Sequence, residues 1–141
     1  MKIEIFGNEE FDNSKLKYAI IFSKYKSKWI YVKHKERSGW VVPSGHREEN
    51  ENIFDTAKRE LYEETGAMSF SIEPLFYYSI ESNEEKNYGK VFYARVEELG
   101  ILPNFEIERI DFFENQPSDL TYSEIHQVLE QEVIKLICNL E

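Results

Sequence analysis

The first half of the chain alternates between apolar and polar residues in a way that predicts short strands. Four segments are rich in β-branched and aromatic side chains, which favour extended structure: residues 1–6, 16–25, 28–34 and 39–43. The second and third flank a short polar turn and therefore predict a hairpin. Pro43 ends the fourth strand, and the polar stretch SGHREENEN that follows predicts a loop of about nine residues.

Between Ile53 and Thr65 the apolar positions take on a helical period. Asn52 is a suitable N-cap, because its side chain can accept a hydrogen bond from the first free backbone N–H groups. Gly66 stands where a C′ glycine commonly ends a helix. The pattern predicts a helix from Ile53 to Thr65.

The second half predicts more strands and a final helix. Residues 71–82 and 90–98 form two strand candidates around the turn NEEKNYG, and residues 107–114 form another. The sequence TYSE at 121–124 has the form of a capping box. The helix that it opens has its apolar residues at helical spacing: Ile125, Val128, Leu129, Val133, Leu136 and Leu140. This order predicts a mixed sheet with helices packed on it, an α/β or α+β sandwich.

Length and composition favour one globular domain over residues 1–141. The chain has 141 residues, of which 41% are hydrophobic, enough to form a single buried core. Cys138 is the one cysteine, so an internal disulfide is excluded, and we interpret it as a small buried apolar residue. No run of about 18 apolar residues predicts a membrane span, and the N-terminus lacks a signal pattern. A cytoplasmic protein is the expectation.

Charge limits the class of partner. The chain carries 17 Lys and Arg against 27 Asp and Glu, a net charge of −10, which argues against general affinity for duplex nucleic acid. A small phosphorylated substrate remains possible where a metal ion mediates the contact. Ten of the 17 cationic residues precede residue 48, among them Lys33, Lys35 and Arg37.

The predicted helix carries an acidic edge. On a helical wheel Glu60, Glu63 and Glu64 lie on one side of the apolar face, and Glu51 in the preceding loop could join them. Four carboxylates beside a buried face are suited to a hard cation such as Mg²⁺ or Mn²⁺. The alternative is a solvated acidic helix face, which is the common origin of such a stripe.

The spacing of these residues favours the metal site. Gly45 and Glu51 are separated by five residues, and after seven more the chain reads RELYEETGA over residues 59–67. This pattern resembles the Nudix box, G-x5-E-x7-R-E-U-x-E-E-x-G-U, in which U is a bulky aliphatic residue. Ala67 is a small residue for the last position. Ser44 and Asn50 stand where the family often has glycine, which alters loop detail and keeps every carboxylate.

The resemblance implies a Nudix-type α/β/α sandwich with a mixed sheet, and a hydrolase acting on phosphoric anhydrides. It implies that Glu60, Glu63 and Glu64 are metal carboxylates, with the backbone carbonyl of Gly45 as a further ligand. Arg59 would orient a neighbouring glutamate, Glu51 or Glu60, through charge-assisted hydrogen bonds. The family often uses one more acid from outside the box. Glu106 is our candidate, and its competitors are Glu81, Glu84 and Glu108.

Other residues have two interpretations each. Lys33, Lys35 and Arg37 either contact substrate phosphates or form a solvated strand end, and their common parity could place all three on one side. His34 and His46 are expected to be ordinary surface or loop residues, and His126 has no assigned role. Four strand aromatics could stack on a base, although such residues more often form core: Phe76, Tyr77, Tyr78 and Tyr93.

The leading hypothesis is a metal-dependent pyrophosphohydrolase that converts a nucleoside triphosphate, including an oxidised one, to the monophosphate and pyrophosphate. General similarity to MutT-like enzymes of small size favours this substrate. ADP-ribose, dinucleoside polyphosphates, NDP-sugars and the 5′ end of RNA stay open, and so does the choice between monomer and homodimer. The alternative class is a Nudix-like domain that senses a nucleotide without cleaving it. Retention of every box carboxylate favours catalysis.

Overall fold

The centre of the fold is the parallel pairing of β2 (Leu16–Tyr25) with β6 (Glu85–Leu99). The computed structural model describes residues 1–7, 9–103 and 106–138, and within them the strands form one mixed sheet of order β1-β5-β6-β2-β3-β7. The other bounds are β1 Lys2–Phe6, β3 Lys28–His34, β5 Ala67–Ser82 and β7 Ile107–Phe113. The short strand β4, Ser44–His46, pairs with β2 beside β3.

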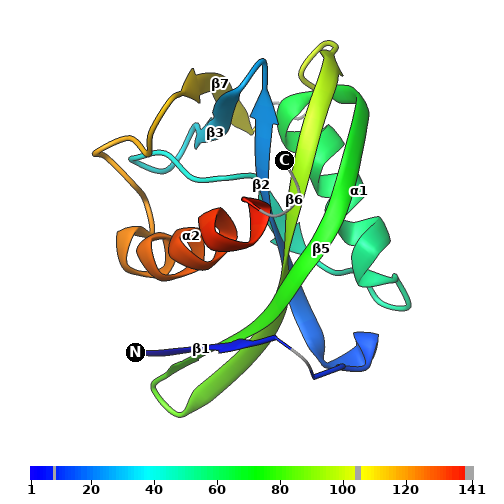
Figure 1. Ribbon diagram of the computed structural model, residues 1–141, viewed down its shortest axis with the longest axis vertical. Coiled ribbons are helices and arrows are strands. Elements are labelled where there is room, and N and C mark those ends of the chain that lie inside the picture. Colours follow the sequence, from blue (N-terminus) through cyan, green and yellow to red (C-terminus); the bar gives the residue numbers. More distant parts are fainter. Residues whose placement is uncertain (8, 104–105, 139–141) are drawn as a thin grey trace.

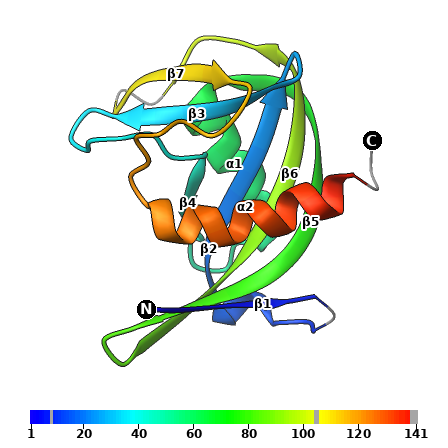
Figure 2. The ribbon, with the colours of Figure 1, turned by 60° about the vertical axis from the view of Figure 1, so that its left-hand side comes forward.

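Two helices cover opposite faces of this sheet (Figures 1 and 2). The helix α1, Ile53–Thr65, buries Ala57 and Leu61 among one group of core residues. The helix α2, Ser123–Ile137, buries Leu129 and Val133 in a second group. The predicted mixed sheet between helices is therefore confirmed.

Local signals position α1 as predicted. Asn52 has an extended backbone, and its Oδ1 accepts a hydrogen bond from the Phe54 N–H at 2.8 Å. Gly66 ends the helix with a φ of 79°, in the left-handed region that glycine adopts without steric cost. These caps fix where the acidic edge of the helix begins and ends.

The predicted strand at residues 39–43 is wrong. Only isolated bridges form there, Val41 with Val32 and Trp40 with Leu120, and the regular strand is β4, within the predicted loop. The reason lies in the partners: Trp40 and Val41 bond to two different segments, whereas residues of β4 pair in register with β2. One side of β4 faces the acidic edge of α1, and the strand contains polar residues. It therefore lacks the apolar alternation from which a strand is predicted.

The hairpin of β5 and β6 is longer than predicted. Its turn is formed by Asn83 and Glu84, both with positive φ, instead of by seven residues. Polar residues such as Asn87 were interpreted as turn because they lack apolar alternation. They pair within the ladder, where Asn87 lies opposite Ile80.

The capping-box prediction for α2 is also wrong. Tyr122 is the N-cap and has no side-chain capping bond. The Thr121 hydroxyl instead donates to the Ser38 carbonyl oxygen at 2.8 Å. This bond ties the start of α2 to the loop after β3, a contact that local sequence does not reveal. Leu140, predicted on the apolar face, lies outside the described residues.

Membrane insertion has no support from the helices. In the ranges that the structure describes, neither helix combines the length and the apolar character needed to cross a bilayer.

Candidate active site

A cavity of about 730 Å³ opens between the acidic edge of α1, strand β4 and helix α2. Five carboxylate residues line it: Glu48, Glu60, Glu63, Glu64 and Glu106. The rest of the lining is largely apolar and aromatic, with Tyr18 and Ile20 from β2, Trp40 from the loop between β3 and β4, and Ile125 from α2. Cavities of this size commonly hold small-molecule ligands in proteins.

Strand β4 brings the backbone of Gly45 against the Glu60 carboxylate. A Cβ atom at position 45 would collide with all three terminal atoms of the Glu60 side chain. Gly45 is therefore needed for space and not for an unusual backbone angle, since its φ is not positive. The sequence placed these two residues 15 positions apart on one motif, and the β2–β4 pairing explains why they meet.

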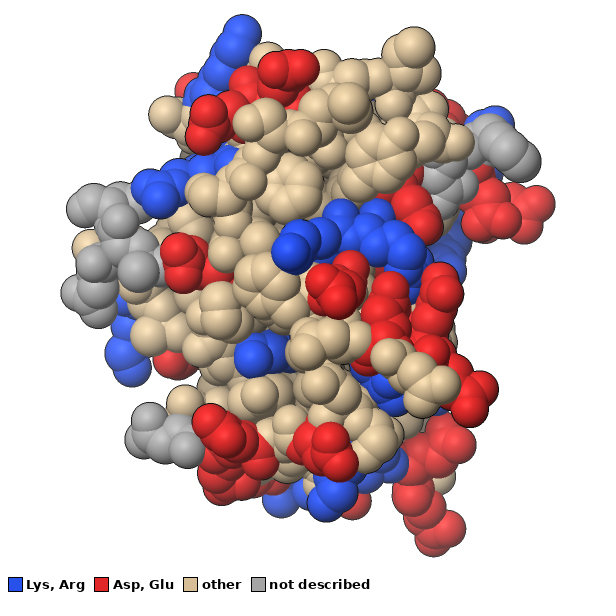
Figure 3. Space-filling model, turned by 90° about the vertical axis from the view of Figure 1, so that its right-hand side faces the viewer, with Lys and Arg blue, Asp and Glu red and all other residues tan. Residues whose placement is uncertain are grey.

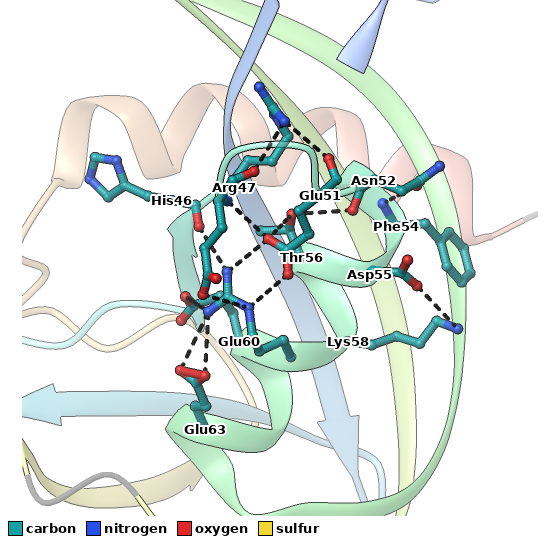
Figure 4. A network of polar contacts seen from close by, with 12 residues as sticks. His46, Arg47, Glu51, Asn52, Phe54, Asp55, Thr56, Lys58, Glu60 and Glu63 are labelled. Carbon is teal, nitrogen blue, oxygen red and sulfur yellow. Dashed lines mark hydrogen bonds and ion pairs between the residues drawn. The ribbon is translucent and has the colours of Figure 1, made fainter. Parts of the chain in front are cut away.

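Arg59 links the carboxylates of the acidic edge, of which Figure 4 shows Glu60 and Glu63, to Glu51 of the preceding loop. Its guanidinium binds Glu51 through two bonds, Nε to Oε2 at 2.8 Å and Nη2 to Oε1 at 2.9 Å. Nη1 donates to Glu60 Oε1 at 2.8 Å and to Glu63 Oε1 at 3.3 Å, and Nη2 also reaches the His46 carbonyl at 3.0 Å. We predicted that Arg59 bonds to Glu51 or Glu60, and it bonds to both.

Glu51 is enclosed by donors. Besides Arg59, the Thr56 hydroxyl donates to its Oε1 at 2.7 Å, and the backbone N–H of Glu48 donates to the same oxygen at 3.0 Å. The hydrogen bond from Arg59 is the main cause that lowers the pKa of Glu51 to about 2. Glu51 is thus ionised at neutral pH, and it holds Arg59 and the loop before α1. The left-handed backbone of Asn50, with φ of 66°, fits this loop.

Glu64 is the buried member of the acidic set. Its side chain is almost fully enclosed, and Oε1 accepts a hydrogen bond from the Ser44 N–H at 3.0 Å. Burial raises its pKa to about 8, and the nearby charge of Glu60 adds to the rise. Burial also raises the pKa of Glu60. A positive charge close to Glu64 would favour the ionised form of this carboxylate at neutral pH.

The donor set suits a hard divalent cation, although the side chains are not gathered into a finished coordination shell. No group of three or more His, Cys, Asp or Glu side chains converges on one point among the residues described. Glu60 and Glu63 are turned toward Arg59, while Glu64 is turned toward Ser44. A cation near Gly45 would offset the desolvation that raises the pKa values of Glu60 and Glu64. The residues therefore fit the metal.

The other predicted residues divide between the cavity and its surroundings. Glu106 and Arg37 line the cavity, and Lys33 and Lys35 do not. The backbone N–H of Lys35 donates to the Glu106 carbonyl at 2.9 Å, which fixes the position of Glu106 beside the loop after β3. The three cations consequently do not share one role in the cavity.

All three histidines line the cavity, including His46, which was expected to be an ordinary surface or loop residue. His34, expected at the surface, lines the cavity with its Nε2 3.8 Å from Glu64 Oε2, and burial lowers its pKa. His126 also lines the cavity; its Nε2 lies 2.8 Å from Glu130 Oε2 and 3.0 Å from the Tyr31 hydroxyl. Both positions depend on contacts between distant strands and helices, so residue spacing carried no signal for them.

Of the four strand aromatics, Tyr78 lines the cavity, while Phe76 and Tyr93 belong to the core. Tyr77 packs against Phe11 at 5.1 Å between ring centroids, outside the cavity. The other Phe, Tyr and Trp residues of the lining were missed, because they come from β2, the loop before β4 and the start of α2: Tyr18, Phe22, Trp40 and Tyr122.

Comparison with known proteins identifies the class. The model of the NUDIX domain matches residues 18–114, and the chain belongs to this family, whose members hydrolyse phosphoric anhydrides. Nudix hydrolases generally need divalent metal ions.

One curated relative and several solved structures are similar to the chain. YtkD of Bacillus subtilis (strain 168), which carries the provisional name 8-oxo-dGTP diphosphatase, is 28% identical over 111 residues. The match covers 79% of this chain and 65% of YtkD, so the chain spans somewhat less than two thirds of that relative.

Among solved structures, a point mutant of the Bacillus subtilis pyrophosphohydrolase BsRppH has a TM-score of 0.81 at 22% identity, covering 95% of this chain and 89% of that one. The NUDIX domain of Shewanella oneidensis NrtR in complex with ADP ribose has a TM-score of 0.64 at 18% identity, covering 89% and 94%. At these identities the two structures establish the fold.

Proposed function

We propose that the protein is a metal-dependent pyrophosphohydrolase that converts a nucleoside triphosphate, oxidised forms included, to the monophosphate and pyrophosphate. One observation carries the proposal: the Nudix carboxylates Glu60, Glu63 and Glu64 line a single cavity with the backbone of Gly45. A sensing domain has no need for three carboxylates in one cavity, among them the buried Glu64. The provisional name of YtkD supports the choice of substrate.

Glu60, Glu63, Glu64 and the carbonyl of Gly45 would hold the metal, for which we propose Mg²⁺. Bound there, the ion neutralises charge on the phosphates of the substrate. Arg59 keeps Glu60 and Glu63 in place through the bonds described above, and Glu51 fixes Arg59 in turn. Because these side chains are already held in place, less free energy is needed to bring their negative charges together around an anionic substrate.

The reaction is attack of water on a phosphorus atom of the anhydride, with rupture of the bond to the bridging oxygen. A carboxylate must accept the proton that the water loses. Glu106 is our candidate, because it lines the same cavity as the acidic edge of α1 and its backbone carbonyl accepts the Lys35 N–H. Arg37, also in the lining, would contact the phosphates.

The apolar lining of the cavity suits a nucleoside. Its aromatic and aliphatic side chains can bury a base, and Asn87 offers a polar group among them. Acidic and apolar side chains thus line one cavity, as a nucleotide combines phosphates with a base.

The test is a release assay with Mg²⁺ or Mn²⁺ on dNTPs, 8-oxo-dGTP, ADP-ribose, dinucleoside polyphosphates and NDP-sugars, in which added pyrophosphatase reports pyrophosphate. We expect metal-dependent pyrophosphate release from a nucleoside triphosphate, abolished in Glu63→Gln. Turnover of a different class of substrate alone would support a hydrolase and would replace the proposed substrate. Nucleotide binding without turnover, measured by calorimetry on the folded protein, would contradict catalysis and favour sensing.

A further inference from the structure

The strand β1 leaves one edge of the sheet open. It is the outermost strand at one end of the sheet, beside β5 (Figures 1 and 2). Among the residues that the structure describes, no backbone group outside β5 forms a hydrogen bond with the backbone of residues 2–6. The free edge of such a strand presents a row of N–H and C=O groups to which another strand can add.

The other edge strand, β7, is partly blocked by its own side chain. The Phe112 N–H donates to Asp111 Oδ1 at 2.8 Å. A backbone donor that is already bonded to a neighbouring side chain is not free to pair with a new strand. Of the two edge strands, β1 is therefore the better site for the addition of a strand.

The two charges of β1 have no ion-pair partner in the described ranges of the chain. Lys2 and Glu4 alternate with Ile3 and Ile5, and neither charge lies at ion-pair distance from another. On the face shown in Figure 3, by contrast, acidic and basic side chains lie side by side. Ile3 and Ile5 pack on the core group that contains Leu129 of α2, so Lys2 and Glu4 share the other face of the strand. A cation and an anion two residues apart on one face can complement a second copy of the same strand.

Symmetry and charge restrict how two β1 strands can pair. Two identical antiparallel strands are related by a two-fold axis perpendicular to the sheet, so that directly opposite residues lie on the same face and one residue lies at the axis. An axis at Lys2 or at Glu4 would oppose like charges, which destabilises an antiparallel pair. An axis at Ile5 would leave both charges without a partner. An axis at Ile3 places Lys2 of each copy opposite Glu4 of the other, and brings the two Ile3 side chains together.

We propose that the protein forms a symmetric homodimer in which the β1 strands of two copies pair antiparallel, with Ile3 at the two-fold axis. The two sheets then continue into one another, and two Lys2–Glu4 pairs cross the junction. Because the axis is perpendicular to the sheet, the α2 helices of both copies lie on the same face. Ile80 of β5 lies directly opposite Ile3 and lines the cavity, so the lining of each cavity begins one strand away from the junction.

The first measurement is the mass of the wild-type protein in solution, by sedimentation equilibrium over a wide range of concentration. We expect twice the mass of one chain at high concentration and dissociation on dilution, because a strand of five residues makes a small interface. The mass of a single chain at every concentration would overturn the proposal.

Exchange of charge assigns the dimer to β1. Lys2→Glu opposes anions across the junction and Glu4→Lys opposes cations, so the dissociation constant of each variant alone should rise by about tenfold or more. An equal mixture of the two variants should recover a heterodimer of wild-type affinity, because every cross-strand pair again joins opposite charges. Lys28→Glu, at an exposed position of β3, is the control for net charge and should dimerise as wild type does. Dimers that neither exchange weakens, or a mixture that stays monomeric, would overturn the pairing through β1.

A disulfide tests the register independently of charge. In a Cys138→Ser background, which removes the one native cysteine, Ile3→Cys should form an intermolecular disulfide on mild oxidation, since directly opposed Cα atoms lie about 4.5–5.5 Å apart. Ile5→Cys is the matched control, because its two copies would lie about 13 Å apart along the junction, beyond the reach of a disulfide. Equal cross-linking of the two variants would contradict the axis at Ile3. Thermal melts of each variant establish that the fold is retained, which matters for Lys2→Glu because residue 2 also lies opposite Glu81 of β5.

Discussion

Arg59 and Glu51 form two parallel hydrogen bonds, 2.8 and 2.9 Å long, between the first turns of α1 and the loop that precedes it. The pair is mostly buried, and the same guanidinium also holds Glu60. Its planar fork can satisfy two carboxylates at once, which the single ammonium of lysine cannot do. The geometry of the acidic edge therefore depends on an arginine.

Arg59→Lys should lower the free energy of unfolding by about 1–3 kcal/mol, because bonds to buried carboxylates are lost. It should also lower kcat by more than tenfold, since Glu60 and Glu63 lose their fixed positions. Denaturant titration and steady-state kinetics measure the two effects. Lys58→Arg, at the neighbouring exposed position, is the control and should change neither quantity. Wild-type turnover in Arg59→Lys would show that the fork is not needed.

The depressed pKa of Glu51 predicts acid sensitivity. Since its folded pKa is about 2 and its ordinary value is 4.5, its contribution to stability is present above pH 4.5 and is lost as pH falls toward 2. Glu51→Gln should be less stable than wild type at pH 7, and the difference should shrink through this window. Thermal melts between pH 2 and 7 check it. A difference that stays constant with pH would show that charge on Glu51 contributes nothing.

The raised pKa of Glu64 predicts the opposite dependence of stability on pH. Its pKa of about 8 lies above the ordinary 4.5, so its contribution to the stability of the metal-free protein is greatest below pH 4.5 and is lost as pH rises through 8. Glu64→Gln should raise the metal-free Tm at pH 8 by several degrees while reducing turnover by orders of magnitude. Glu63→Gln, with a more exposed carboxylate, should reduce turnover with little change in Tm. Differential scanning calorimetry with and without Mg²⁺ measures this. A lower metal-free Tm in Glu64→Gln would contradict the burial argument.

The parts of the fold that the sequence predicts well are those with local causes. Asn52 and Gly66 cap α1 through their own backbone and side chain, so the helix ended where expected. Thr121 shows the limit: it had the residue type of a cap, yet its hydroxyl donates to Ser38 across the fold. Strand β4 was missed for a similar reason, because its pairing with β2 is long-range and its polar residues conceal it.

The same distinction holds for the site. The acidic edge was predictable because Glu60, Glu63 and Glu64 come from one helix with fixed spacing. The aromatic lining was not, because Trp40 and Tyr122 reach the cavity through contacts between distant segments, such as the bridge of Trp40 with Leu120. The spacing of residues along the chain identifies functional side chains that share one helix. The shape of the cavity, which selects the substrate, depends on how several helices and strands pack together.

Substitution of Gly45 tests whether Glu60 has to pack against the backbone of β4. Gly45→Ala adds one methyl group that collides with the Glu60 carboxylate, while the backbone angle itself suits alanine. Glu60 must move, so we expect the Mg²⁺-induced rise in Tm and kcat each to fall, kcat by about tenfold or more, with the metal-free fold retained. Gly7→Ala is the matched control, since nothing lies within 4 Å of a Cβ there. Full activity in Gly45→Ala would mean that Glu60 can leave Gly45 without cost, and would remove this contact from the metal site.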